Sequence, residues 1–82
     1  MNKDPKVYVE VVARFDTEGR LLPQTIRWED DTIYEIDKIK YICRAASLKA
    51  GGVGIRYTVM IQGKETYLFL EENRWFVERR AV

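Results

Sequence analysis

The middle of the sequence carries a block of basic side chains whose chemistry suits the binding of phosphate groups. Cations neutralise the phosphates of a nucleic acid, and aromatic rings stack on its bases. Tyr41 and Tyr57 lie within the block and supply the aromatic rings. Residues 38–64 contain no acidic residue and six basic ones, namely Lys38, Lys40, Arg44, Lys49, Arg56 and Lys64. This combination predicts contact with RNA or DNA.

The segment before the basic block has the opposite charge. Residues 28–37 contain no basic residue and five acidic ones: Glu29, Asp30, Asp31, Glu35 and Asp37. The net charge of the chain is only +1, whereas dedicated nucleic-acid-binding domains are usually strongly basic. Two other interpretations therefore stay open. The basic side chains solvate the wet face of a sheet, or the acidic segment of one copy meets the basic segment of another in a protein–protein interface or homo-oligomer.

The residue types on which most enzymes depend are nearly missing from the chain. It has no histidine and a single cysteine, Cys43. This excludes the usual zinc sites, histidine-based catalytic triads and an intrachain disulfide. In the glycine-rich segment 50–54, Lys49 precedes the glycines, which is the wrong order for a phosphate-binding loop and predicts a simple hairpin loop. We therefore predict a binding module that is not an enzyme and uses no cofactor and no metal.

Short β-strands are predicted to position these side chains. Apolar and polar residues alternate along most of the chain, and polar or glycine-containing turns separate the alternating segments. In residues 68–70 the apolar run is continuous, so both faces of that strand are predicted to be covered. Apart from the middle segment, the predicted strands are residues 6–15, 21–29, 55–62, 65–71 and 74–78.

The segment 33–48 supports two interpretations. Thr32 and Glu35 fit a helix capping box, and the isoleucines that follow are spaced nearly as one helical face. Four isoleucines and two tyrosines within residues 33–42 favour a strand instead, with a phase change such as a bulge near Asp37. If this strand pairs with residues 55–62, one outward face is expected to carry Lys38, Lys40, Arg44 and Arg56, with Tyr41 or Tyr57 nearby.

The strands predict an all-β fold, a small five- or six-stranded barrel or roll, with an α+β fold containing a helix at about 33–49 as the alternative. The length of 82 residues allows one domain, residues 1–82, of which 1–5 are predicted to be disordered. The sequence has no apolar run long enough to span a membrane and no signal-peptide core. Together with the single cysteine, this predicts a cytoplasmic protein without a membrane partner.

Five stretches after Lys6 form a characteristic combination. They are Pro23-x-x-Ile26-x-Trp28, Tyr34-x-Ile36-Asp37-x-Ile39, Ala45-Ala46-Ser47-Leu48-Lys49-Ala50-Gly51-Gly52, and Glu65-Thr66-Tyr67-Leu68 with Trp75-Phe76-Val77-Glu78. The combination resembles a family of short, uncharacterised bacterial proteins, mostly from low-GC Gram-positive organisms. The resemblance implies a small SH3-like β-barrel and favours a long bent strand over residues 33–48. It implies no activity and no binding residues.

Overall fold

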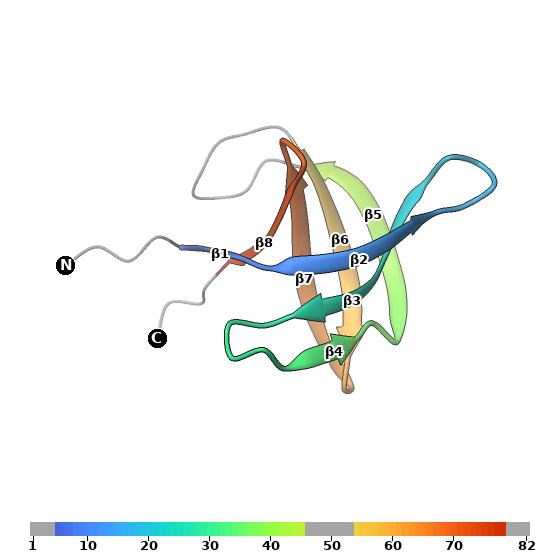
Figure 1. Cartoon of the computed structure of the whole chain (residues 1–82). Coiled ribbons are helices and arrows are strands. Elements are labelled where there is room, and N and C mark those ends of the chain that lie inside the picture. The colour runs from blue at the N-terminus through green and yellow to red at the C-terminus, as the bar shows by residue number, and fades with distance from the viewer. Residues whose placement is uncertain (1–4, 46–53, 79–82) are drawn as a thin grey trace.

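The structure, a computed structural model, describes residues 5–45 and 54–78 (Figure 1). These residues form β-strands and turns and contain no helix. The all-β prediction is therefore confirmed, and the helical alternative is wrong for residues 33–45; residues 46–49 lie outside the described part. The strands are β1 (Lys6–Tyr8), β2 (Glu10–Phe15), β3 (Leu21–Arg27), β4 (Ile33–Glu35), β5 (Lys38–Ala45), β6 (Gly54–Ile61), β7 (Lys64–Glu71) and β8 (Arg74–Glu78).

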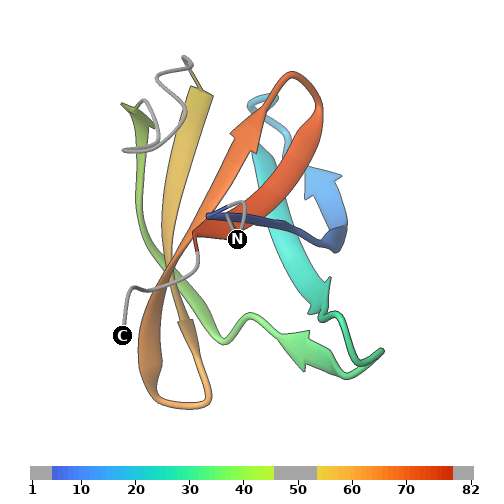
Figure 2. The same cartoon turned by 90° about the vertical axis from the view of Figure 1, so that its left-hand side faces the viewer.

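The strands make two antiparallel sheets. The larger sheet has the order β1-β8-β7-β6-β5, and the smaller sheet has the order β2-β3-β4. Figure 2 shows the smaller sheet lying across one face of the larger one. Within residues 5–45 and 54–78 no strand of one sheet pairs with a strand of the other. The two sheets therefore do not close into a barrel.

Two long segments cross from one sheet to the other, and the bend in each divides it into two strands. The described residues therefore contain eight strands, whereas the sequence predicts five or six. The first segment bends at Val9, whose backbone N–H donates to the carbonyl oxygen of Trp75 at 3.1 Å. The second bends at Ile36 and Asp37, whose N–H groups donate to Gln24 of β3 and Met60 of β6, each at 2.9 Å. Residues 33–45 thus form one bent extended segment that changes phase at Asp37, as the strand interpretation required.

The core lies between the two sheets. Its centre is formed by Val59 and Leu68, each with no exposed surface, and by Tyr57 at 1% exposure. Ile26 of β3 packs on them from the smaller sheet. Leu68 faces this core, whereas Phe69 is buried on the opposite face of β7, so the prediction that both faces of this strand are covered is confirmed.

Two tight turns set the register of β6, β7 and β8. Gln62 and Gly63 join β6 to β7 with φ angles of 51° and 77°, and Glu72 and Asn73 join β7 to β8 with φ angles of 50° and 66°. Two consecutive residues with positive φ match the twist of the flanking strands in a hairpin. Asp37 Oδ2 accepts a 3.0 Å hydrogen bond from the N–H of Gln62, which ties the first turn to the bend between β4 and β5.

Candidate binding surfaces

The register of β5, β6 and β7 decides on which side of the large sheet each candidate residue lies. Cross-strand partners in an antiparallel sheet share one face, and neighbours along a strand lie on opposite faces. Tyr57 pairs with Ile42 and Leu68 and faces the core. Arg56 and Thr58 therefore lie on the other side of the sheet. We call this side, which turns away from β2–β3–β4, the outer face.

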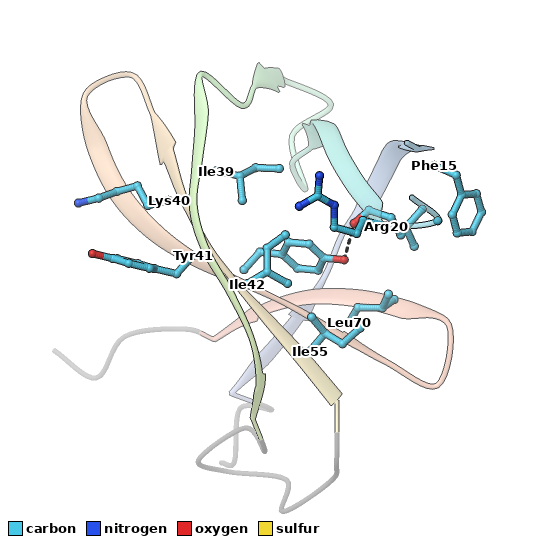
Figure 3. A pocket seen from close by; sticks show the side chains of 11 residues that line it. Phe15, Arg20, Ile39, Lys40, Tyr41, Ile42, Ile55 and Leu70 are labelled. Carbon is cyan, nitrogen blue, oxygen red and sulfur yellow. Dashed lines mark hydrogen bonds between the residues drawn. The ribbon is translucent and has the colours of Figure 1, made fainter. Parts of the chain in front are cut away.

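Three of the six predicted basic residues lie on the outer face. Lys38 is paired with Met60, and Arg56 is paired with Cys43 of β5 and Phe69 of β7. Lys40 lies at an irregularity in the pairing between Ile39 and Tyr41, and its Nζ is 2.9 Å from Glu65 Oε1. Figure 3 shows the side chains of Lys40 and Tyr41 pointing to the same side of β5, away from Ile39.

Arg44 does not share the outer face, and that expectation is wrong. The irregularity at Lys40 adds one residue to β5, so the alternation of side chains shifts by one position beyond it. Arg44 consequently pairs with Ile55 and lies on the core-facing side of the sheet, at its exposed edge. Lys64 lies beside the β6–β7 turn and pairs with Ile61, and Lys49 falls outside the described residues.

The prediction that Tyr57 contacts nucleic acid is also wrong, because its side chain is buried and cannot stack on a base. Its hydroxyl donates a 2.6 Å hydrogen bond to the carbonyl oxygen of Leu21. Burial raises the pKa of the Tyr57 hydroxyl above its ordinary value. This tyrosine therefore belongs to the contact between the two sheets.

Tyr67 is the aromatic residue that sequence reasoning missed. It pairs with Thr58, which also pairs with Tyr41, so the two tyrosines flank one buried threonine on the outer face. Tyr41 is 66% exposed and Tyr67 is 47% exposed. Since neighbouring strands lie about 4.8 Å apart, the backbones that carry the two rings are separated by about 10 Å.

The guanidinium group of Arg56 lies over Tyr67 on this face. Its Cζ is 4.7 Å from the centroid of the Tyr67 ring, within the range of a cation–π interaction. Within the described residues, Arg56 Nε is buried without a hydrogen-bond partner. The outer face thus presents a planar cation over the ring of one tyrosine and a second, more exposed tyrosine two strands away.

A second surface is an open cleft of about 770 Å³ on the side where the two sheets are not joined. Ile39 and Ile42 of β5 form one wall, and Figure 3 shows both side chains pointing into it. Leu21 and Arg20 line the opposite wall, which is the hairpin of β2 and β3. Phe15 of that hairpin lies at the far end and is 71% exposed. The volume lies within the range of small-molecule and peptide sites.

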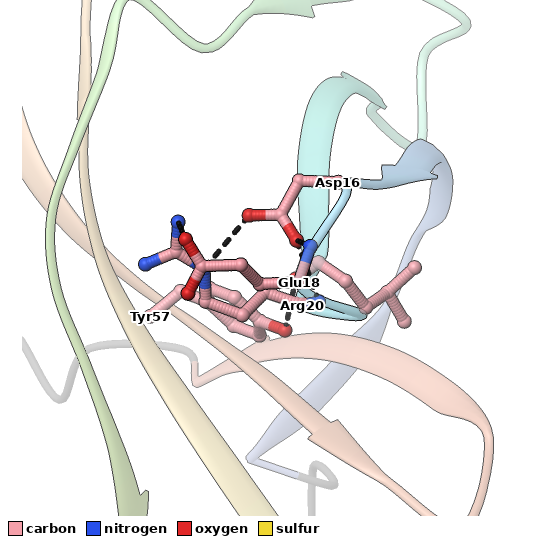
Figure 4. Close-up of polar contacts among 5 residues, drawn as sticks. Asp16, Glu18, Arg20 and Tyr57 are labelled. Carbon is pink, nitrogen blue, oxygen red and sulfur yellow. Dashed lines mark hydrogen bonds and ion pairs between the residues drawn. The ribbon is translucent and has the colours of Figure 1, made fainter.

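Hydrogen bonds fix the hairpin wall of the cleft (Figure 4). Asp16 Oδ1 accepts from the backbone N–H groups of Arg20 at 2.8 Å and Glu18 at 2.9 Å. Arg20 Nε also donates to Asp16 Oδ2 at 2.7 Å. The backbone hydrogen bond from Arg20, followed by its side-chain hydrogen bond, holds the pKa of Asp16 below its ordinary value. The turn is therefore ordered by its own side chains.

Residues 5–45 and 54–78 contain no group of three or more His, Cys, Asp and Glu side chains that could hold a metal ion. In the same residues there is no helix with the length and apolar character needed to cross a membrane. No family model, no curated protein and no solved structure matches the chain. The function is therefore inferred from the two surfaces described above.

Proposed function

We propose that the protein is a non-enzymatic binding module whose outer face contacts single-stranded nucleic acid. The observation that carries this proposal is the placement of Tyr41 and Tyr67 on either side of Thr58, with the guanidinium group of Arg56 over the Tyr67 ring. Two exposed rings on one sheet face offer stacking platforms for unpaired bases. Bases in a duplex are already stacked on one another, so this surface favours a single strand.

The charges beside the tyrosines support contact with phosphates. Within the described residues, Lys38 has no ion pair and Arg56 has no carboxylate partner. Lys40 Nζ donates a hydrogen bond to Glu65 Oε1, and this bond raises the pKa of Lys40. Because both side chains of this pair are partly exposed, the pair is weak in water and a phosphate can replace Glu65 as the partner of Lys40.

The test is fluorescence anisotropy of labelled oligonucleotides across a salt series. The probes are single-stranded RNA, single-stranded DNA and duplex DNA of about 12 nucleotides or base pairs, a length that covers the site of one small domain. We expect the single strands to bind more tightly than the duplex and their affinity to fall steeply with salt. Absence of binding at low salt would overturn the proposal.

Two matched variants locate the surface. Tyr41→Ala and Tyr67→Ala are each expected to weaken binding about tenfold, because one stacked base is worth about 1–3 kcal/mol. Phe15→Ala removes an exposed aromatic ring from the β2–β3 hairpin, away from the outer face, and is expected to leave the affinity unchanged. Equal effects of all three substitutions would contradict a site on the outer face.

We further propose that the fold is related to SH3-like barrels, that the chain belongs with the bacterial family its sequence resembles, and that it acts in the cytoplasm. The strong bend of residues 33–45 between two sheets supports the first point. The lone cysteine supports the last. Cell fractionation of the native host tests the location. Protein–protein interaction is the second candidate function, and the cleft between the sheets supports it.

A further inference from the structure

Strand β5 has one edge without a partner strand. It is the last strand of the larger sheet, and only β6 pairs with it within the described residues. Alternate N–H and C=O groups of an edge strand point away from its neighbour and are available for pairing with another chain. This edge borders the cleft, because Ile39 and Ile42 of β5 form one of the cleft walls.

Strand β3, across the cleft, offers an apolar wall but poor backbone pairing. The carbonyl oxygen of Leu21 already accepts the hydroxyl of Tyr57. Pro23 lacks a backbone N–H and cannot donate to a strand beside it. A segment that enters the cleft therefore adds to β5 as a new edge strand and lays side chains against Leu21.

The two faces of β5 specify what such a strand must carry. Side chains that point inward meet the apolar wall formed by Ile39 and Ile42, with Ile55 and Leu70 behind it. Side chains that point outward lie beside Lys38 and Lys40 on the outer face. Opposite charges on neighbouring strands attract, and like charges repel. The complementary segment thus alternates apolar with acidic residues.

Strand β5 of a second copy does not match this edge. Residues 38–45 contain three basic residues and no acidic one. Pairing of β5 with β5 of another copy joins two strands that both carry a net positive charge, which is unfavourable. Lysines on an edge strand commonly prevent this kind of self-association. Charge complementarity instead favours a strand that carries acidic residues.

We propose that the free edge of β5 binds an extended segment of a partner protein in which apolar and acidic residues alternate. The segment adds to the larger sheet by backbone hydrogen bonds, places its apolar side chains in the cleft and directs its carboxylates towards Lys38 and Lys40. Main-chain pairing supplies affinity, and the alternate side chains supply selectivity. This site lies next to the proposed nucleic-acid surface and shares Lys38 and Lys40 with it, whereas Ile42 belongs to the peptide site alone.

The test uses a fluorescein-labelled peptide of about eight residues, the length of a typical strand, in which valine and glutamate alternate. Two control peptides have lysine in place of glutamate or the same residues sorted into an apolar and an acidic block. We expect the alternating acidic peptide to bind at least about tenfold more tightly than either control. We also expect it to slow hydrogen exchange at alternate amides of β5. Equal binding of the three peptides, or protection elsewhere in the chain, would overturn the proposal.

Variants separate this site from the other surfaces. Ile42→Glu puts a charge into the cleft wall at a side chain that is 42% exposed, so the fold is expected to persist. It should abolish peptide binding and preserve nucleic-acid binding. Val12→Glu changes a residue of β2 that is 61% exposed and does not line the cleft, and should alter neither. Circular dichroism verifies that both variants are folded.

A charge exchange provides the decisive control. The double variant Lys38→Glu with Lys40→Glu should reverse the preference, so that the lysine peptide binds more tightly than the glutamate peptide. An unchanged preference would contradict the proposed orientation of the strand. Sedimentation of the protein without peptide completes the test: dimers that protect the β5 amides would assign the edge to a second copy and overturn the proposal.

Discussion

The hydroxyl of Tyr57 donates a 2.6 Å hydrogen bond to the carbonyl oxygen of Leu21, and this contact links the larger sheet to the smaller one. The two residues are 36 positions apart in the sequence. The bond lies at the cleft, where no described strand pair joins the sheets, and both of its residues line that cleft. It therefore holds the cleft walls together at a place where the backbone does not.

Tyr57→Phe is expected to destabilise the fold by about 1 kcal/mol, the usual net value of a buried hydrogen bond whose acceptor is left without a partner. Urea unfolding followed by tryptophan fluorescence measures the change. Tyr41→Phe removes a hydroxyl from a side chain that is 66% exposed and serves as the control, for which no change is expected. Equal stability of the two variants would show that the Tyr57 hydroxyl contributes nothing.

The lowered pKa of Asp16 predicts a dependence of stability on pH. A carboxylate with a lowered pKa in the folded state stabilises the fold above its unfolded pKa and loses this effect as the pH falls through the folded value. Asp16→Asn should therefore be less stable than the parent at neutral pH. The difference should vanish at a pH well below the ordinary value of 3.8.

Urea unfolding of both proteins at about pH 7 and about pH 2 measures this difference. Glu18→Gln is the matched control, since Glu18 Oε2 lies 3.9 Å from Arg20 Nη2 and its side chain is 75% exposed. It should have little effect at either pH. A difference between Asp16→Asn and the parent that persists in acid would assign the effect to geometry rather than to charge.

The turn between β6 and β7 offers a stabilising substitution. Gln62 has a φ of 51°, which side chains other than asparagine and glycine rarely adopt. Asparagine followed by glycine is the preferred pair for this turn, so Gln62→Asn should raise the free energy of unfolding by about 0.5 kcal/mol. Thermal unfolding measures the shift. Gly63→Ala, at a φ of 77°, should act in the opposite direction.

Gly54, the first residue of β6, lies close to β7. A Cβ atom at this position would lie 2.5 Å from the carbonyl oxygen of Leu70 and would also overlap Glu71 Cγ. Because a backbone atom cannot move away as a side chain can, Gly54→Ala should destabilise the fold by about 1–3 kcal/mol. A parent-like melting temperature would show that the two strands separate more easily than the structure indicates.

Arg56 tests whether shape matters as well as charge on the outer face. Arg56→Lys keeps the positive charge but loses the planar group that lies over Tyr67, so single-strand affinity should fall. Lys38→Arg keeps the charge at a site without a ring contact and should change the affinity little. Anisotropy with single-stranded RNA compares the two. Equal affinities would reduce the role of this face to charge alone.

The sequence predicts local strand structure well where one face is apolar. The alternation in residues 55–61 predicts the strand that the structure contains, and the unbroken apolar run at 68–70 predicts burial on both faces of β7. The sequence also predicts the phase change near Asp37. Without it, the isoleucines before and after Asp37 could not share one face of a strand.

The irregularity at Lys40 and the cleft could not be predicted in the same way. The single extra residue depends on pairing with β6, yet it moves Arg44 to the other side of the sheet. Tyr67 directly precedes the apolar run of β7, so the sequence does not indicate that its ring is exposed. Its place on the outer face follows only from its pairing with Thr58. The cleft joins the β2–β3 hairpin to β5 and depends on long-range packing that no local pattern records.

The pairing of β1 with β8 has a consequence for synthesis of the protein in the cell. Lys6 lies opposite Glu78, so β1 can pair with the larger sheet only after β8 has been synthesised. Until then β1 and the first bend at Val9 have no partner from the other end of the chain. Completion of the native sheet is therefore expected to follow translation of β8, and a ribosome stalled before β8 should hold a chain that proteases still cleave near β1.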